Sequence, residues 1–171
     1  MKIAIYGPDF NEQSHSAIVT LSEYLSERAV EVSIEINFYH SILKQSSIKI
    51  DRFGFQTFQN LDTSFDLLIS VGGDGTILRA ITHVKDLNIP IVGVNTGRLG
   101  FLATIKKDAI VGALNQIFEG KYRISRRSVL SVTTDLKEAN LDLDFALNEI
   151  AISRKNTTSM ISIETWLDDE Y

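Results

Sequence analysis

The sequence contains no cysteine, which excludes disulfide frameworks, thiolate zinc sites, iron–sulfur clusters and cysteine nucleophiles together. Proline is scarce, with 2 residues in 171, and the 10 glycines follow no repeat, so a collagen-like chain is excluded as well. Positive charge is also in deficit, because 17 Lys and Arg residues against 22 Asp and Glu residues give a net charge of −5. Such a chain lacks the basic field that drives binding to nucleic acid or anionic membranes, so we expect local groups to hold any anionic ligand.

Long apolar runs are missing too. The opening segment, residues 1–7, reaches Pro8 and Asp9 at once and is too short for the core of a signal peptide or for a membrane span. The composition, 44% hydrophobic and 23% charged, is typical of a folded soluble protein with one ordinary domain or two small ones. We therefore expect a cytoplasmic protein that binds neither membranes nor nucleic acid.

Apolar strand patterns and helical stripes alternate from residue 1 to about residue 121. The run 65–71 is nearly unbroken, as in a parallel strand covered on both faces, whereas 30–39 alternates like a strand with one covered face. A short helix is predicted around 41–45. This alternation predicts an α/β fold with an open, mostly parallel sheet. The remaining predictions are strands over 2–7 and 89–94, helices on the stripes Ile18/Leu21/Leu25/Ala29 and Ile77–Val84, and a helix over Ile110–Phe118 that Asp108 caps and Gly120 stops.

The pattern changes after Gly120, where stretches rich in β-forming residues are separated by turn-like segments without helical stripes. We place a domain boundary near Lys121, which gives an α/β domain over 1–121 and a β-rich domain over 122–171. The second part is too short for the two packed sheets of a self-sufficient β domain, so we expect an incomplete domain in a chain that is cut short. The β-rich stretches are 128–134, 143–153 and 159–167.

Three glycines fall within four positions in Gly72-Gly73-Asp74-Gly75-Thr76, between a buried strand and a predicted helix. Glycines let the backbone approach a ligand closely, and a helix start aims N–H groups at an anion, so a phosphate is the expected ligand. The segment matches neither Gly-x-Gly-x-x-Gly nor the Walker loop, because the Lys-Ser/Thr pair is missing and Asp74 stands in the middle.

A carboxylate beside a phosphate is repulsive unless it binds the accompanying metal or takes a proton from a hydroxyl that attacks phosphorus. Asp74 therefore indicates phosphoryl transfer onto an alcohol rather than passive nucleotide binding. The alternative is a tight strand-to-helix turn in which Asp74 only caps the helix, a role that aspartate fills well.

A second candidate segment, Asn95-Thr96-Gly97-Arg98-Leu99-Gly100-Phe101-Leu102, follows the next buried strand. Asn95 and Thr96 lie at the end of that strand, where open α/β sheets bind ligands, although such residues also cap turns. Arg98 either steers a phosphate or is solvated. Phe101 either packs against a ligand or fills the core.

Other polar residues have weaker patterns. Asn148 and Glu149 interrupt an apolar strand pattern, so they either bind a ligand or mark a strand edge open to water. Trp166 is expected in the core or in an interface. The histidines lack metal-ligand spacing, so no metal ligand is predicted among His15, His40 and His83. A basic cluster near the boundary is expected to be solvated, with a phosphate or subunit contact as the alternative, and comprises Lys121, Arg123, Arg126 and Arg127.

Taken in order, the segments 72–76 and 95–102 and the pair Asn148-Glu149 resemble the NAD kinase family. The first segment alone also resembles diacylglycerol and sphingosine kinases, and the Asn-x-Gly-x-Leu-Gly-Phe stretch is what favours NAD kinase. The resemblance implies transfer of the terminal phosphoryl group of ATP, or of polyphosphate, to the adenosine ribose 2′-hydroxyl of NAD, giving NADP. It also implies Mg²⁺ with the donor, a homodimer or homotetramer, and a larger β domain containing Gly-Ser-Thr-Ala-Tyr beyond the residues present.

By the same resemblance, Asp74 would activate the hydroxyl and Phe101 would pack near the adenine. Asn148 and Glu149 would contact the base edge and the ribose hydroxyls. The glycine turn would hold phosphates. The implied nucleotide-binding residues are Gly72, Gly73, Gly75, Thr76, Asn95, Gly97, Phe101, Asn148 and Glu149.

Two other functions stay open. One is a nucleotide-binding or regulatory module that performs no catalysis as this 171-residue chain. The other is a lipid kinase of the diacylglycerol or sphingosine type, which is weaker because the sequence shows no amphipathic or basic helix suited to a membrane surface.

Overall fold

The computed structural model describes residues 1–45, 47–98, 100–135, 144–154, 160–168 and 170. The chain divides into two compact units, Met1–Arg126 and Arg127–Tyr171. The division lies a few residues beyond Lys121, where the sequence places the boundary between its two domains.

In the described part of the first unit, six strands form one sheet in the order β3-β2-β1-β4-β5-β6, and each strand pairs in parallel with its neighbours. The predicted open parallel α/β sheet is confirmed. The strand order changes direction between β1 and β4, and in open α/β sheets ligands bind in the crevice at such a switch point. The strands are β1 (Lys2–Tyr6), β2 (Glu31–Glu35), β3 (Gln56–Phe58), β4 (Leu67–Gly72), β5 (Ile91–Asn95) and β6 (Ile105–Lys106).

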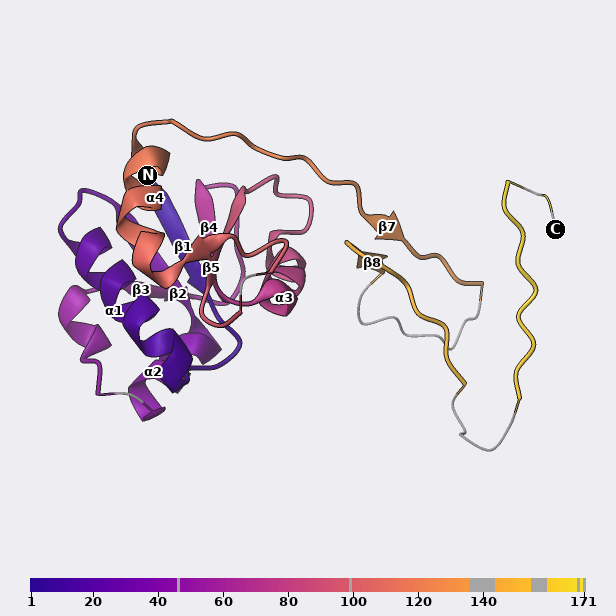
Figure 1. Ribbon diagram of the computed structural model, residues 1–171, viewed down its shortest axis with the longest axis horizontal. Helices are drawn as coiled ribbons and strands as arrows, with labels where there is room; N and C mark the ends of the chain where they lie inside the picture. The colour runs from indigo at the N-terminus through magenta and orange to yellow at the C-terminus, as the bar shows by residue number, and fades with distance from the viewer. Residues whose placement is uncertain (46, 99, 136–143, 155–159, 169, 171) are drawn as a thin grey trace. The chain divides into compact units, whose positions relative to one another are not determined.

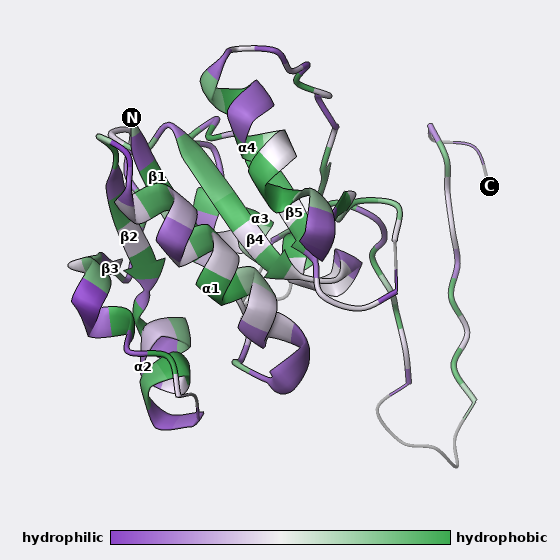
Figure 2. Cartoon of the chain, turned by 60° about the vertical axis from the view of Figure 1, so that its left-hand side comes forward, coloured by the Kyte–Doolittle hydropathy of each residue, from purple (hydrophilic) through white to green (hydrophobic). Residues whose placement is uncertain are grey.

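Helices cover both faces of this sheet. Figure 2 shows α1 and α4 over one face, where Leu21 and Leu114 join Ile5 in the larger apolar cluster. On the other face Ala80 of α3 packs with Leu68 in a second cluster. Each fully buried Leu or Ile contributes about 1.5–3 kcal/mol, so these two clusters fix the strands that carry the candidate site. The helices are α1 (Glu12–Ser26), α2 (Ile36–Gln45), α3 (Asp74–Val84) and α4 (Ile110–Phe118), with short 3-10 helices at Ile50–Phe53 and Lys107–Ala109 (Figure 1).

The central strand β4 is buried along Leu67–Val71, and its apolar sequence explains why. A strand between two parallel neighbours and under helices on both faces meets little water, so an unbroken apolar run is the stable pattern. This prediction is confirmed, as are the strand before α1 and the helix that starts after the glycine turn. The strand therefore delivers Gly72 and the turn behind it to the carboxyl edge of the sheet.

The predicted strand over 30–39 is wrong after Glu35, because α2 begins at Ile36. The Glu35 carboxylate accepts hydrogen bonds from the Phe38 N–H at 2.8 Å and from Asn37 Nδ2 at 2.9 Å, and so satisfies an amide at the helix start. Phe38 then packs into the core one helical turn before Ile42. The expectation of a single covered face also fails, since Glu35 itself is only 5% exposed.

Both bounds of α4 and its stop agree with the prediction, but the predicted cap does not. Gly120 adopts φ +70°, the left-handed conformation that ends helices, and its N–H bonds to the Ile117 carbonyl. Asp108, by contrast, lies in the short 3-10 helix before α4, and the residue at the cap position is Ala109 without a side-chain hydrogen bond. α4 thus follows directly from a 3-10 helix and has no side-chain cap.

In the described part of the second unit, the regular structure is limited to short pieces. β7 (Leu130–Ser131) pairs antiparallel with β8 (Phe145–Ala146) (Figure 1). An isolated bridge joins Leu167 to Glu170. The prediction of β structure after residue 122 is confirmed at these pieces only. The predicted strand over 143–153 is wrong after Ala146, and parts of all three predicted β stretches lie outside the described residues. Apolar side chains here are exposed, including Ile152, Ile163 and Trp166, so the strands lack the burial that stabilises a sheet.

Gly93 of β5 provides a test of the packing between α3 and the sheet. A methyl group at this position would lie 2.4 Å from Ile77 Cδ1 and 2.7 Å from Ala103 Cα. Because Ala103 Cα belongs to the backbone, Gly93→Ala should lower the free energy of unfolding by about 1–3 kcal/mol in urea denaturation.

The matched control is Gly112→Ala in α4, where a methyl group meets nothing within 4 Å. Alanine favours helix over glycine, so this variant should be as stable as wild type or up to about 1 kcal/mol more stable. Equal unfolding midpoints for Gly93→Ala and wild type would contradict the packing described here.

Candidate active site

The glycine turn joins β4 directly to α3. Gly72 has φ +156°, and a Cβ there would lie 2.1 Å from Thr76 Oγ1, so the fold itself requires glycine at this position. Gly73 and Gly75 differ, because a Cβ at either would meet nothing within 4 Å. These two glycines leave open space beside the start of α3, where the first N–H groups of a helix have no partners within the helix. The turn can therefore accept an anion, as its sequence predicts.

Asp74 is the first residue of α3, and its side chain binds the main chain of residues 101–103. Oδ2 accepts a hydrogen bond from the Phe101 N–H at 2.7 Å. Oδ1 accepts one from the Leu102 N–H at 3.0 Å and one from the Ala103 N–H at 2.9 Å. The cap position of α3 is Gly73, so the alternative role of Asp74 as a helix cap is wrong.

These three bonds hold the pKa of Asp74 below its ordinary value, with the Ala103 amide as the largest cause, followed by those of Phe101 and Leu102. Hydrogen bonds donated to a carboxylate stabilise its charged form. Asp74 is therefore an ionised, oriented carboxylate at the opening of the glycine turn.

Gly100 makes this arrangement possible. A Cβ at Gly100 would lie 2.2 Å from Asp74 Oδ1 and 2.4 Å from Asp74 Cγ. The carboxylate thus occupies the space that any side chain at this position would need. Gly100 belongs to the second candidate segment, but no role is predicted for it from the sequence.

Asn95 organises the same segment from inside the protein, with only 3% of its surface exposed. Its Nδ2 donates to the Arg98 carbonyl at 2.8 Å and to the Ala103 carbonyl at 3.3 Å, and its Oδ1 accepts from the Gly97 N–H at 2.8 Å. The structure thus supports the turn-capping alternative for Asn95. Direct contact between Asn95 and a nucleotide stays a prediction.

The two candidate segments come together at the carboxyl ends of neighbouring strands. Gly72 and Asn95 are paired in the β4–β5 register, and the Thr96 N–H bonds to the Gly72 carbonyl at 3.2 Å. Thr76 and Thr96 are both buried. The sheet therefore joins the glycine turn and the second segment into one site.

Phe101 is 94% exposed, so it does not fill the core. Its main chain binds Asp74 while its ring stays accessible, which leaves the ring available to stack on a planar ligand. Arg98 is exposed as well. Core filling by Phe101 is therefore wrong, and its packing against a ligand stays a prediction.

Other predicted residues belong to different parts of the chain. Asn148 and Glu149 belong to the second unit, follow β8 and are exposed. The basic cluster is exposed, and Lys121 forms an ion pair with Glu119 at 2.7 Å. His83 is half-buried, with its ring centroid 4.7 Å from that of Tyr6, and burial lowers its pKa. Within the described ranges, no three His, Asp or Glu side chains are grouped so as to hold a metal ion.

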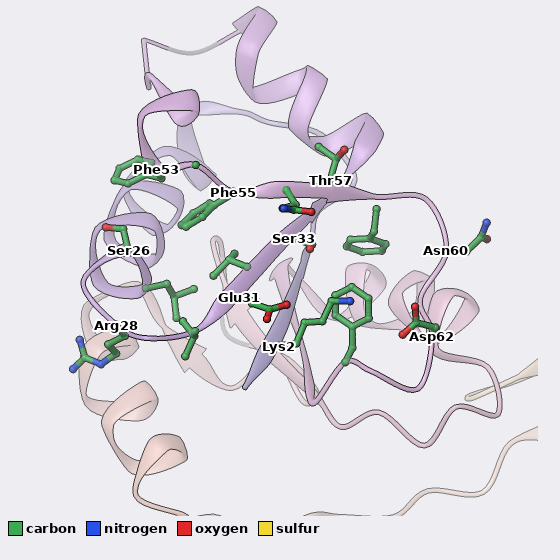
Figure 3. Close-up of a pocket in the computed structure, with 17 residues that line it drawn as sticks. Lys2, Ser26, Arg28, Glu31, Ser33, Phe53, Phe55, Thr57, Asn60 and Asp62 are labelled. Atoms are coloured by element: carbon green, nitrogen blue, oxygen red, sulfur yellow. The ribbon is translucent and has the colours of Figure 1, made fainter.

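A separate pocket of about 540 Å³ lies at the opposite edge of the sheet (Figure 3). It opens between the start of β2 and the segment that leads into β3. Lys2 contributes an ammonium group that donates to Ser64 Oγ at 2.8 Å and lies 4.2 Å from the centre of the Phe65 ring. Its position at the amino end of β1 separates this pocket from the Asp74 site.

Leu102 and Ala103 are functional residues that are not predicted from the sequence. Both act through main-chain N–H groups, which every residue except proline carries, so their side chains give no signal. Gly100 could have been found, because a glycine in a loop after a buried strand suggests a close approach of another group. None of the helices in the described part of the chain has the length and apolar character needed to cross a membrane.

The fold and the site define a class: an open, doubly wound α/β protein with a glycine turn and a fixed carboxylate at the carboxyl edge of its sheet. A family model described as ATP-NAD kinase N-terminal domain matches residues 9–122, so the chain belongs to this family. This confirms the resemblance found in the sequence.

Curated relatives agree with the family. The chain is 49% identical to a NAD kinase of Christiangramia forsetii and 46% identical to one of Flavobacterium psychrophilum, in each case over its whole length and over 58% of the relative. A crystal structure of yeast NADH kinase in complex with NADH matches with a TM-score of 0.66 at 20% identity, over 86% of this chain and 47% of that one, and supports the fold. The chain thus spans just over half the length of the relatives it matches.

The hydrogen bonds to Asp74 predict a pH-dependent contribution to stability. Because its pKa is lower in the folded state than its unfolded value of about 3.9, the carboxylate stabilises the fold above that pH, and this contribution disappears as the pH falls through the folded-state pKa. In Asp74→Asn, an NH₂ group faces an N–H donor. Wild type should exceed this variant in free energy of unfolding at pH 7, by a margin that shrinks below about pH 4.

Urea titrations between pH 2 and pH 7 measure this margin. Asp86→Asn, which changes an exposed aspartate on the loop after α3, is the matched control. A margin for Asp74→Asn that follows the same pH course as the control would show that the three bonds do not hold the carboxylate in solution.

Proposed function

We propose that the intact protein is a NAD kinase, which transfers the terminal phosphoryl group of ATP, or of polyphosphate, to the 2′-hydroxyl of the adenosine ribose of NAD and so forms NADP. The observation that carries this proposal is the ionised carboxylate of Asp74, fixed by three amides at the mouth of a glycine turn. The family match and the curated relatives named NAD kinase support it. Because the chain spans 58% of those relatives, the proposal concerns the intact protein.

In this reaction a bond forms between the ribose O2′ and the terminal phosphorus, and the bond from that phosphorus to its bridging oxygen breaks. Asp74 accepts the hydrogen bond of the 2′-hydroxyl and then its proton, which passes on to solvent. A carboxylate with a low pKa is a weak base, so its first role is to orient the hydroxyl. Late proton transfer suits the loose transition state of phosphoryl transfer.

One acceptor position on Asp74 remains for this hydroxyl. An ionised carboxylate has about four lone-pair sites. Among the described residues, two N–H groups bind Oδ1 and one binds Oδ2. Oδ2 is therefore the atom that would receive the hydroxyl.

The donor phosphates would lie over the open space at Gly73 and Gly75, with the first amides of α3 directed at them. Gly72 and Thr76 shape this turn, since the Thr76 hydroxyl lies over Gly72. Mg²⁺ would arrive with the donor and be held mainly by phosphate oxygens and water, as Mg²⁺ commonly is. Asp74 is the carboxylate of this site, and the described part of the chain contains no cluster of three side chains that could hold the metal ion by itself.

The dinucleotide would use the second segment. The exposed ring of Phe101 would stack on the adenine. Gly97 and Asn95 would keep the segment in shape, and Asn148 and Glu149 would contact the base edge and the ribose hydroxyls. By resemblance to the family we also propose a cytoplasmic homodimer or homotetramer.

The catalytic role is tested by Asp74→Asn in the intact protein. The amide cannot accept the hydroxyl proton, so kcat for NADP formation should fall about 10²- to 10⁴-fold, whereas the Kd for NAD changes little because the side-chain volume is kept. Asp86→Asn serves as the control and should retain wild-type kinetics. Near wild-type turnover by Asp74→Asn would refute the role of Asp74.

The second candidate function is a nucleotide-binding module, which the open space at Gly73 and Gly75 beside the start of α3 would also serve. Calorimetry of the 171-residue chain with NAD and with ATP, followed by an assay for NADP, separates the two functions. Binding without product favours the module, and NADP formation favours the kinase. A lipid acceptor is disfavoured by the family match.

A further inference from the structure

We infer that Asn95 is a positioning residue for Asp74: its buried amide binds Gly97, Arg98 and Ala103, so that three main-chain N–H groups fix the carboxylate and leave one acceptor position of Oδ2 for the reacting hydroxyl. This inference rests on the proposed kinase function. It assigns Asn95 an indirect role, through the main chain, in place of contact with the nucleotide.

The position of Asn95 suits this role. It is the last residue of β5, pairs with Gly72 at the end of β4, and is 3% exposed. Its backbone is therefore held by the sheet beside the turn that carries Asp74. A rigid strand end is a precise support for a loop, because the strands around it are fixed by the core.

The amide of Asn95 closes the loop at both ends. Oδ1 binds the Gly97 N–H near its start, and Nδ2 binds the carbonyls of Arg98 and Ala103, the second of which lies at its end. Ala103 links Asn95 to Asp74 directly, since its carbonyl binds Asn95 while its N–H binds Asp74. Loss of the Asn95 amide would free this residue and loosen the group of donors.

The hydrogen-bonding capacity of the side chain argues against direct ligand contact. A side-chain amide offers two N–H donors, and both of those of Asn95 are used by carbonyls of the loop. The residue is also buried. A nucleotide would have to displace loop carbonyls to reach Nδ2.

Gly100 provides independent support for the view that this loop is built to hold the Asp74 carboxylate. The carboxylate of Asp74 lies where its Cβ would be, with Oδ1 at 2.2 Å from that position. Only a loop with glycine there can bring its amides this close to Asp74. Asn95 therefore holds the loop by hydrogen bonds, and Gly100 leaves the space that the Asp74 carboxylate occupies.

The test compares Asn95→Ala and Gly100→Ala with wild type in the intact protein, using kcat and KM for NAD and ATP between pH 4 and pH 9. Misplacing the carboxylate should lower kcat about 10- to 100-fold, with a smaller change in the KM for ATP. Loss of the amide bonds should also raise the pKa of Asp74 toward its ordinary value, so the acidic limb of the kcat profile should move to higher pH in both variants. Gly112→Ala is the matched control, with no expected change in either quantity.

Asn95→Asp separates the two parts of the amide. It keeps an acceptor for the Gly97 N–H but sets an oxygen against the carbonyls of Arg98 and Ala103. This variant should be as impaired as Asn95→Ala. Wild-type kinetics in Asn95→Asp would overturn the inference.

A stability change alone would overturn it too: if folded Asn95→Ala melts earlier but keeps the wild-type kcat and acidic limb, Asn95 is only structural. If Asn95→Ala does not fold, Gly100→Ala decides, because an unchanged acidic limb there means the amides do not fix Asp74. Failure of the proposed kinase function would look different: wild type would form no NADP, or Asp74→Asn would keep full turnover. A ¹³C titration of the Asp74 carboxyl carbon gives the same comparison of variants without turnover.

Discussion

The carboxylate of Asp74 lies against the main-chain N–H groups of residues 101–103, and the candidate site is built around this contact. It links two loops that leave neighbouring strands, β4 and β5, at the same edge of the sheet. The core needs no such contact, since the strands are held by apolar packing on both faces. Its effect is electrostatic, because three N–H dipoles stabilise the negative charge of Asp74 and hold it in one position.

The three glycines of the turn have different roles, which explains why three of them occur within four residues. Gly72 is required by the fold, because Thr76 occupies the space of a side chain. Gly73 and Gly75 border open space, so the fold would tolerate a methyl group at either position. What they keep is access to the helix start. In this turn one glycine is required by the fold and two keep the helix start open to a ligand. The structure distinguishes these roles, whereas the sequence does not.

The sequence predicts the parts of this protein in which the side-chain pattern determines the structure. β4 is apolar along its length because both its faces are buried. Asp74 is found because it is a charged residue within a run of glycines. The start of α2 is missed because Phe38 fits a strand alternation and a helical face equally well, and the Glu35 cap decides between them. The partners of Asp74 are missed because main-chain donors leave no mark in a sequence. In the second unit, short exposed strands such as β8 have too little burial for a period-2 pattern to fix them.

That the donors to Asp74 are main-chain groups has a consequence for sequence variation in this loop. Exchanging the side chain of Leu102 leaves its N–H in place, and only proline would delete the donor. The electrostatic design is therefore insensitive to most substitutions at that position, while Gly100 tolerates none that adds a Cβ without shifting the carboxylate. Diversity among homologous loops should accordingly concentrate at positions that contribute only an amide.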